Sequence, residues 1–210
     1  GGVNAKYVGE NIGTKIAYIC AADAASVGDC ANMEKQMRAR FGVDPAYRAD
    51  VQEKEVDFRS HMQKIKSMNV DGILVAALAE TMARALVQSY EAGIGEDVRR
   101  IGSSSASNAP VPKIAGDAAK GVFFTAAYAA ADDRPIAKLF NEMTRQRYGI
   151  HAPDHDFSQA YDLVRIMEMA LKSTDLELSS SSLAADRTAI RDAIASVEGY
   201  QGLASGPISF

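Results

Sequence analysis

The sequence has no tryptophan, only two cysteines among its 210 residues, and no apolar run that approaches the length of a membrane span. Because a membrane-spanning helix needs about 20 consecutive apolar residues, no such helix is predicted. Lysine and arginine are not massed on one stretch either, and the formal net charge is −4. The chain therefore lacks the broad cationic surface that nucleic-acid binding requires, and nucleic acid is not expected as a partner.

Export signals are also missing from the printed sequence. It opens with Gly1-Gly2, without Met, and without a basic segment followed by an apolar one. We expect that an export signal was either removed or never present. Composition by itself does not indicate a compartment.

Motifs for phosphate binding and catalysis are absent as well. The glycines of Gly9 to Gly13 and Gly93 to Gly95 do not form Gly-x-Gly-x-x-Gly after a strand, and Gly-Lys-Ser/Thr does not occur. Ser103 to Ser105 lie outside any Gly-x-Ser-x-Gly motif. His151 and His155 have a spacing that could suit a metal, but the proline between them favours a surface turn. The sequence predicts no enzyme, no cofactor and no metal site.

The two cysteines, Cys20 and Cys30, leave two interpretations open. They are ten positions apart, at an expected strand end and in the first turn of the next helix. A disulfide is geometrically feasible there. The alternative is two free, half-buried thiols, which is a common state for cysteine.

The best-defined stretch of the chain is Val70 to Leu86. Ile73 to Leu78 is an unbroken apolar run, which is typical of a parallel strand covered by helices on both faces. A helical pattern follows, with Met82, Leu86 and Tyr90 on one face. Such a unit opens towards a ligand at the carboxyl end of its strand, so Ala77 is expected near a site.

Similar units repeat through the first part of the chain, and strand-helix repetition predicts an α/β fold with a Rossmann-like parallel sheet flanked by helices. The other expected strands are Ile16 to Cys20, a weakly patterned one within Ala46 to Val56, Arg100 to Ser103, and Val122 to Thr125. The other expected helices are Val3 to Asn11, one with Met33, Met37 and Phe41 as its core stripe, and one capped by Asp57. The small residues of Ala21 to Gly28 predict an open loop.

After Pro135 the pattern changes, because two long helices follow without a strand between them. These are Pro135 to Tyr148 and Phe157 to Lys172, and a shorter helix is expected at Asp186 to Ala195. A strand is expected to start at Gly206. The long helices have strong apolar faces, formed by Ile136, Leu139, Phe140 and Met143 and by Tyr161, Val164, Met167 and Leu171.

The order of these segments resembles the extracytoplasmic solute-binding proteins of branched-chain amino-acid ABC transporters, which are type I periplasmic binding proteins. The segments that carry the resemblance are KIAYIC, DFRSHMQKIKSMNVDGILVAAL, IGSSS, AGDAAKGVFFTAAY, FSQAYDLVRIMEMALKSTD, DRTAIRDAIAS and GPISF. The resemblance implies two Rossmann-like lobes that close on a small-molecule ligand, a periplasmic location and a membrane permease as partner. Residues 13–130 would form one ligand-binding lobe, 131–197 would pack on the other lobe, and 198–210 would return to the first-named lobe. The remaining parts of the family pattern are expected before Gly1 and after Phe210.

Family contact positions can be carried over to this sequence. The aromatic contact falls on Val27, the contact after the central strand on Leu78, the acid that pairs with a ligand ammonium on Ser104, and a further aromatic on Phe157. Without an acid at Ser104, an organic carboxylate fits better than an α-amino acid. The expected ligand-binding residues are Ser26, Val27, Ala77, Leu78, Ser103, Ser104, Ser105, Tyr128 and Phe157.

Alternatives remain open at two points. The hydroxyls of Ser103 to Ser105 could contact a ligand or could cap a helix. The same fold could also serve as the ligand-sensing domain of a receptor or regulator. A homodimer is expected for the chain as given, because its long helices would otherwise leave apolar faces in water.

Overall fold

The computed structural model describes residues 2–204 and 206–210 and divides into two compact units, Gly1–Ala126 and Ala127–Phe210. We call them unit 1 and unit 2 and describe each by itself. Among the described helices, none combines the length and apolar character needed to cross a membrane.

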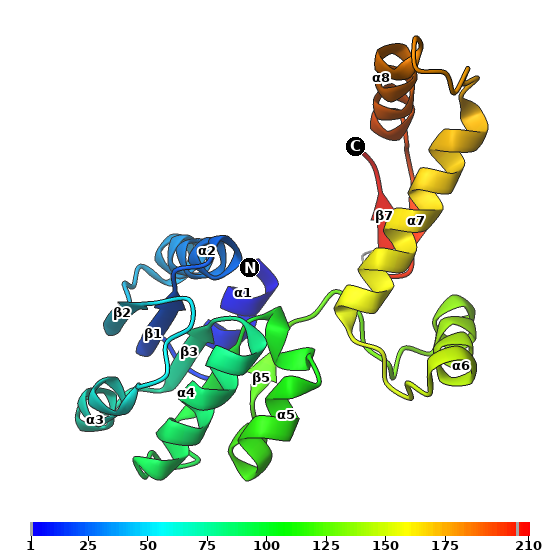
Figure 1. Ribbon diagram of the computed structural model, residues 1–210. Helices are drawn as coiled ribbons and strands as arrows, with labels where there is room; N and C mark the ends of the chain where they lie inside the picture. The colour runs from blue at the N-terminus through cyan, green and yellow to red at the C-terminus, as the bar shows by residue number, and fades with distance from the viewer. Residues whose placement is uncertain (1, 205) are drawn as a thin grey trace. The chain divides into compact units, whose positions relative to one another are not determined.

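Unit 1 is built on a five-stranded parallel sheet with the strand order β2-β1-β3-β4-β5 (Figure 1). The strands are β1 (Ile16–Ala21), β2 (Tyr47–Val51), β3 (Gly72–Ala76), β4 (Arg99–Gly102) and β5 (Phe123–Phe124). Every residue of β1 and β3 is buried, whereas β2 alternates between buried and open positions. Unbroken apolar segments take the central places because both of their faces are covered. The predicted α/β fold with a parallel sheet is confirmed.

Helices cover both faces of this sheet, as Figure 1 shows. On one face lie α1 (Gly2–Asn11) and α2 (Ala24–Phe41), and on the other α3 (Arg59–Ser67), α4 (Ala79–Glu91) and α5 (Pro110–Ala115). Alternate side chains of β1 enter the two cores: Ile16, Tyr18 and Cys20 pack with α1 and α2, and Ala17, Ile19 and Ala21 pack with α3 and α4. This alternation is the period of two that a strand imposes on its side chains.

Three local expectations for unit 1 are wrong. The open loop predicted for Ala21 to Gly28 is mostly helix, because α2 begins at Ala24 with Asp23 as its N-cap. Asp57 does not cap α3: Phe58 holds that position, while the Asp57 carboxylate binds the Arg59 side chain and backbone N–H. Tyr90 is exposed rather than part of the buried face of α4.

The described residues of unit 2 form three helices and a short hairpin. The helices are α6 (Pro135–Tyr148), α7 (His155–Ser173) and α8 (Leu183–Ala195), and the antiparallel strands are β6 (Tyr200–Gly202) and β7 (Gly206–Ile208). Its small core contains Tyr128, Ala137, Phe140 and Leu203. Both long helices were predicted, α6 with its observed bounds, and the expected strand at Gly206 is the second strand of this hairpin. The assignment of residues 131–197 to another lobe remains a prediction.

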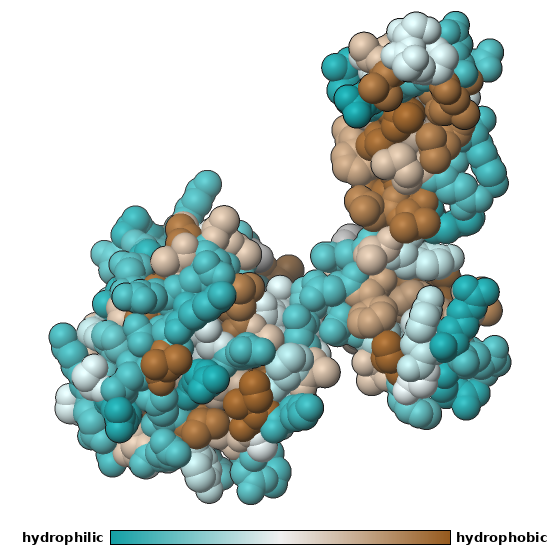
Figure 2. Space-filling model, viewed as in Figure 1, coloured by the Kyte–Doolittle hydropathy of each residue, from teal (hydrophilic) through white to brown (hydrophobic). Residues whose placement is uncertain are grey.

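The face of α7 that is buried within unit 2 differs from its apolar stripe. The buried residues are His155, Ser158, Asp162, Ile166 and Ala170. Val164, Met167 and Leu171 of the apolar stripe are exposed, in line with the expectation that the chain leaves this face in water. Figure 2 shows apolar surface gathered over the α7 and α8 part of unit 2. Within the described residues of unit 2, the hairpin segment binds α7 through Asp162, and α8 also contacts α7.

Candidate functional site

Seven of the nine predicted ligand-binding residues follow three neighbouring strands of unit 1. Ser26 and Val27 lie after β1, Ala77 and Leu78 after β3, and Ser103 to Ser105 after β4. The strands are parallel and adjacent, with Cys20 beside Ala76 and Val75 beside Gly102. Their carboxyl ends therefore share one edge of the sheet, which is where open α/β sheets bind ligands. We call it the carboxyl edge of unit 1.

The first turn of α2 supplies one side of this edge. Asp23 is its N-cap, and one carboxylate oxygen accepts a hydrogen bond from the Ser26 N–H at 2.9 Å. Ser26 is buried, so its hydroxyl faces the protein, whereas the Val27 side chain is 46% exposed. The turn therefore presents an apolar side chain at the position where the resemblance implies an aromatic one.

The turn after β3 supplies the middle of the edge. Ala77 is buried, and Leu78, the N-cap of α4, is 44% exposed and makes no side-chain capping bond. The next helical turn is anchored by Thr81, whose hydroxyl donates to the Glu53 carbonyl at 2.9 Å. Leu78 thus adds a second exposed apolar side chain on a fixed backbone.

The serine run after β4 divides into two roles. Ser103 is buried, and its hydroxyl donates to the Ala77 carbonyl at 3.3 Å, which ties the β4 turn to the β3 turn. Ser104 and Ser105 are half-buried in the short 3-10 helix η1 (Ser104–Ser107), and the described residues offer their hydroxyls no hydrogen bond. No side-chain cap is formed by Ser103 at η1. The helix-capping interpretation therefore does not describe this serine, and ligand contact by Ser104 and Ser105 stays a prediction.

The other two predicted residues, Tyr128 and Phe157, belong to unit 2. The Tyr128 hydroxyl donates to the Asn141 side chain at 2.7 Å, and its ring packs edge-on against Phe140. Burial raises the pKa of Tyr128. Phe157 lies in the first turn of α7 and is 42% exposed, so its ring is open to a neighbour.

Sequence reasoning missed Asp23 as a residue of this edge. Its second carboxylate oxygen is buried and has no hydrogen-bond partner in the described part of the chain. The sequence did contain a signal for this role, because Asp23 is a typical N-cap residue that closely follows the first expected strand and precedes Ser26 by three positions. A buried unpaired acceptor is costly, so this oxygen calls for a donor from water or a ligand.

The segments that follow β1, β3 and β4 at the carboxyl edge carry acidic side chains and no basic ones. The segments 22–29, 77–81 and 103–109 contain Asp23, Asp29 and Glu80 but no lysine, arginine or histidine. A ligand carboxylate bound by these three segments would therefore meet serine hydroxyls and backbone N–H groups rather than a guanidinium. In the described residues no group of three or more metal-ligating side chains occurs. The expected surface turn at His155 is wrong, because His155 is a buried residue of α7.

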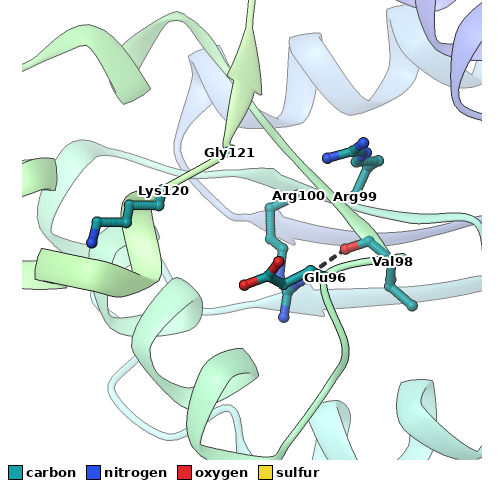
Figure 3. Close-up of a pocket in the computed structure, with 6 residues that line it drawn as sticks. All are labelled: Glu96, Val98, Arg99, Arg100, Lys120 and Gly121. Atoms are coloured by element: carbon teal, nitrogen blue, oxygen red, sulfur yellow. Dashed lines mark hydrogen bonds between the residues drawn. The ribbon is translucent and has the colours of Figure 1, made fainter.

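Two cavities lie at the opposite, amino edge of the sheet, with volumes of about 150 and 570 Å³. They share Glu96, Arg100 and Lys120 as lining residues, and Figure 3 shows the smaller one. Desolvation lowers the pKa of the Arg100 guanidinium, which donates to backbone carbonyls of Ile94, Gly95 and Val98. Since these bonds hold the loop between α4 and β4, the arginine has a structural role.

Comparisons with known proteins extend over almost the whole chain. A family model described as "Periplasmic binding protein" matches residues 3–210. No curated protein sequence matches the chain.

Solved structures share the fold. A leucine-binding protein from Thermotoga maritima is 20% identical, with a TM-score of 0.84 over 100% of this chain and 57% of its own. A branched-chain amino acid substrate-binding protein from Streptococcus pneumoniae, in complex with isoleucine, is 19% identical, with a TM-score of 0.82 over 98% of this chain and 55% of its own. A solute-binding protein from R. palustris, in complex with benzoate, is 16% identical, with a TM-score of 0.81 over 100% and 54%. The chain thus spans just over half the length of these proteins.

Proposed function

Because the chain belongs to the periplasmic binding protein family, we propose that it captures a small organic solute outside the cytoplasm for the permease of an ABC transporter. The family match over residues 3–210 carries this proposal. The carboxyl edge of unit 1 supports it, because it combines exposed apolar side chains with free hydroxyls, and small-molecule sites are typically apolar with a few placed polar groups.

The proposed ligand has an apolar body and a carboxylate, as in branched-chain or aromatic amino acids and related organic acids. Leucine, isoleucine and benzoate, named for the three structural relatives, belong to this class. Val27 and Leu78 would contact the apolar body, and Ser104 and Ser105 would bind the polar end. Ser26, Ala77 and Ser103 would shape the walls. Tyr128 and Phe157 of unit 2 are also proposed as ligand contacts, and this part of the proposal is supported by the family resemblance alone.

A periplasmic location is part of the same proposal. The structure contains a disulfide between Cys20 and Cys30. Disulfides form and persist in oxidising compartments and are rare in the cytosol. This bond therefore agrees with a protein that works outside the cytoplasm.

The test is a thermal-shift screen of the protein against amino acids, aromatic acids and keto acids, followed by calorimetry. A ligand at 100 times its Kd adds about 2.7 kcal/mol to the free energy of unfolding, which is a measurable rise in Tm. Leu78→Asp should abolish the shift. Tyr90→Asp is the matched control, because Tyr90 is an exposed apolar residue in the last turn of α4 whereas Leu78 precedes the first. A screen without any binder, or steady-state turnover of a compound, would contradict the proposal.

A further inference from the structure

The Cys20–Cys30 disulfide encloses the part of the carboxyl edge that contains Ser26 and Val27. Cys20 is the last residue but one of β1, and Cys30 lies in the second turn of α2. Both cysteines are buried in the core between α2 and the sheet. The bond therefore connects the end of a central strand to the start of the helix that follows it.

This start of α2 is weak as a helix by its own sequence. Ser26, Val27, Gly28 and Asp29 are consecutive, and all four have lower helix propensity than alanine or leucine. Of these four residues, glycine destabilises a helix the most. Gly28 also packs against nothing, since a Cβ added at this position would meet no atom within 4 Å. Local preference does not hold this turn in place.

Packing contributes little to the same turn. The buried residues of α2 are Ser26, Cys30, Met33 and Met37, so the first large apolar anchor lies beyond the disulfide. Besides the disulfide and the hydrogen bonds within the helix, Asp23 accepts hydrogen bonds from the N–H groups of Ser26 and Val27.

We infer that the disulfide is the positioning device for the first turn of α2, and that it thereby fixes the ligand contact of Val27. The ligand part of this inference rests on the proposed function. Without the bond, the turn frays while the sheet and the rest of α2 stay folded. Val27 then samples several positions, and a ligand must order it again on binding, which lowers affinity.

Amide hydrogen exchange of the whole chain tests the positioning without any ligand. In the double variant Cys20→Ala/Cys30→Ala, the Ser26 and Val27 amides should exchange at least about 10-fold faster, relative to the Leu74 and Val75 amides of β3, since local fraying exposes them. Unchanged exchange, or the same acceleration in β3, would overturn the inference.

Two matched variants sharpen the result. Met37→Ala removes a buried side chain of the same helix and core, so it should accelerate the β3 amides and leave the first turn unchanged. Gly28→Ala, added to the double variant, should slow the Ser26 and Val27 amides by about threefold, because alanine restores helix propensity. Absence of this rescue would also argue against fraying of the turn.

Calorimetry with L-leucine, L-isoleucine and benzoate then separates the two proposals. Binding that becomes about tenfold weaker in the double variant supports the positioning role. Binding of equal affinity in both forms overturns the ligand part of the inference and leaves the proposed function intact. If none of the probes binds, the proposed ligand class fails, and the exchange data still decide whether the disulfide positions the turn.

Discussion

At the scale of single residues, Arg100 stabilises the loop between α4 and β4 through hydrogen bonds from its charged side chain. Its guanidinium donates to the carbonyls of Ile94, Gly95 and Val98 at 2.6 to 2.9 Å, within a partly desolvated site. Arg100→Gln should lower the free energy of unfolding by about 2–3 kcal/mol, because several loop carbonyls lose their partner. Urea denaturation measures the change. Arg99→Gln is the control at the exposed neighbouring position and should stay within about 0.5 kcal/mol of the parent protein. Equal losses in both variants would contradict the role of Arg100.

We expect the ionisation of Tyr18 to lower the stability of the folded protein at alkaline pH. Burial, with a further effect from the charge of Glu34, raises the pKa of its phenol. Because the pKa is higher in the folded state, the neutral Tyr18 phenol contributes fully to the free energy of unfolding below the unfolded-state pKa of about 10. This contribution is lost as the pH rises through the folded-state pKa. The melting temperature should therefore fall above pH 10. Tyr18→Phe should show a shallower fall across the same range, and identical curves would exclude Tyr18 as a cause.

We expect the side chain at position 104 to decide whether the site prefers an amino acid or a simple carboxylate. A carboxylate at this position would pair with a ligand ammonium and repel a second carboxylate. Ser104→Glu should therefore strengthen leucine binding and weaken benzoate binding, by about 1–3 kcal/mol for a charged hydrogen bond. Calorimetry of both ligands measures the change, and Ser104→Gln separates charge from size. If neither affinity moves, Ser104 does not contact the ligand.

At the scale of elements, a buried carboxylate joins α7 to the β6–β7 hairpin of unit 2. Asp162 accepts hydrogen bonds from the N–H groups of Leu203 and Ala204, both at 2.8 Å, and from the Tyr200 hydroxyl at 3.3 Å. The structure makes it the attachment point of a segment some forty positions away.

This attachment predicts a large effect of one substitution. Asp162→Ala should destabilise unit 2 by about 2–4 kcal/mol, because two buried N–H groups lose their acceptor. Exchange of the Leu203 and Ala204 amides should accelerate first. Asp192→Ala, which removes an exposed carboxylate of α8, should leave both amides unchanged. Similar exchange in the two variants would mean that the hairpin is held by packing alone.

At the scale of the whole molecule, the exposed apolar residues of unit 2 predict self-association of the 210-residue chain. Leu163, Val164 and Leu171 of α7 and Leu139 of α6 are all exposed. Each large apolar side chain left in water forgoes roughly 1.5–3 kcal/mol, so contact between two copies is favoured. Sedimentation at micromolar concentration should detect dimers or larger species.

A charged substitution tests which surface is responsible. Val164→Glu together with Leu171→Glu should shift the chain towards monomer, since a contact through α7 would bury both charges. Leu178→Glu is the control, because Leu178 lies in the loop before α8 and is exposed as well. A parent protein that sediments as a monomer would exclude association through these helices.

The sequence by itself determined the order and type of the main elements. An unbroken apolar run predicted the central strand β3, and Pro135 with the helical periodicity after it predicted α6 with its observed bounds. Repetition of strand and helix predicted the parallel sheet. These features follow from local patterns, because the period of a strand or helix fixes which side chains share a face. The choice of Val27, Leu78 and Ser104 as ligand contacts came from the family resemblance and stays a prediction.

Tertiary structure alone decided which partner each face has. It placed β1 between β2 and β3, closed the Cys20–Cys30 disulfide that the spacing left open, and turned Ser103 towards the Ala77 carbonyl. It also buried the Asp162 side of α7 and exposed the side with the stronger apolar pattern. The periodicity of a sequence indicates that one face of a helix or strand can be buried. Which face is buried, and against which segment, depends on hydrogen bonds and contacts between residues far apart in the chain, and no local pattern contains these.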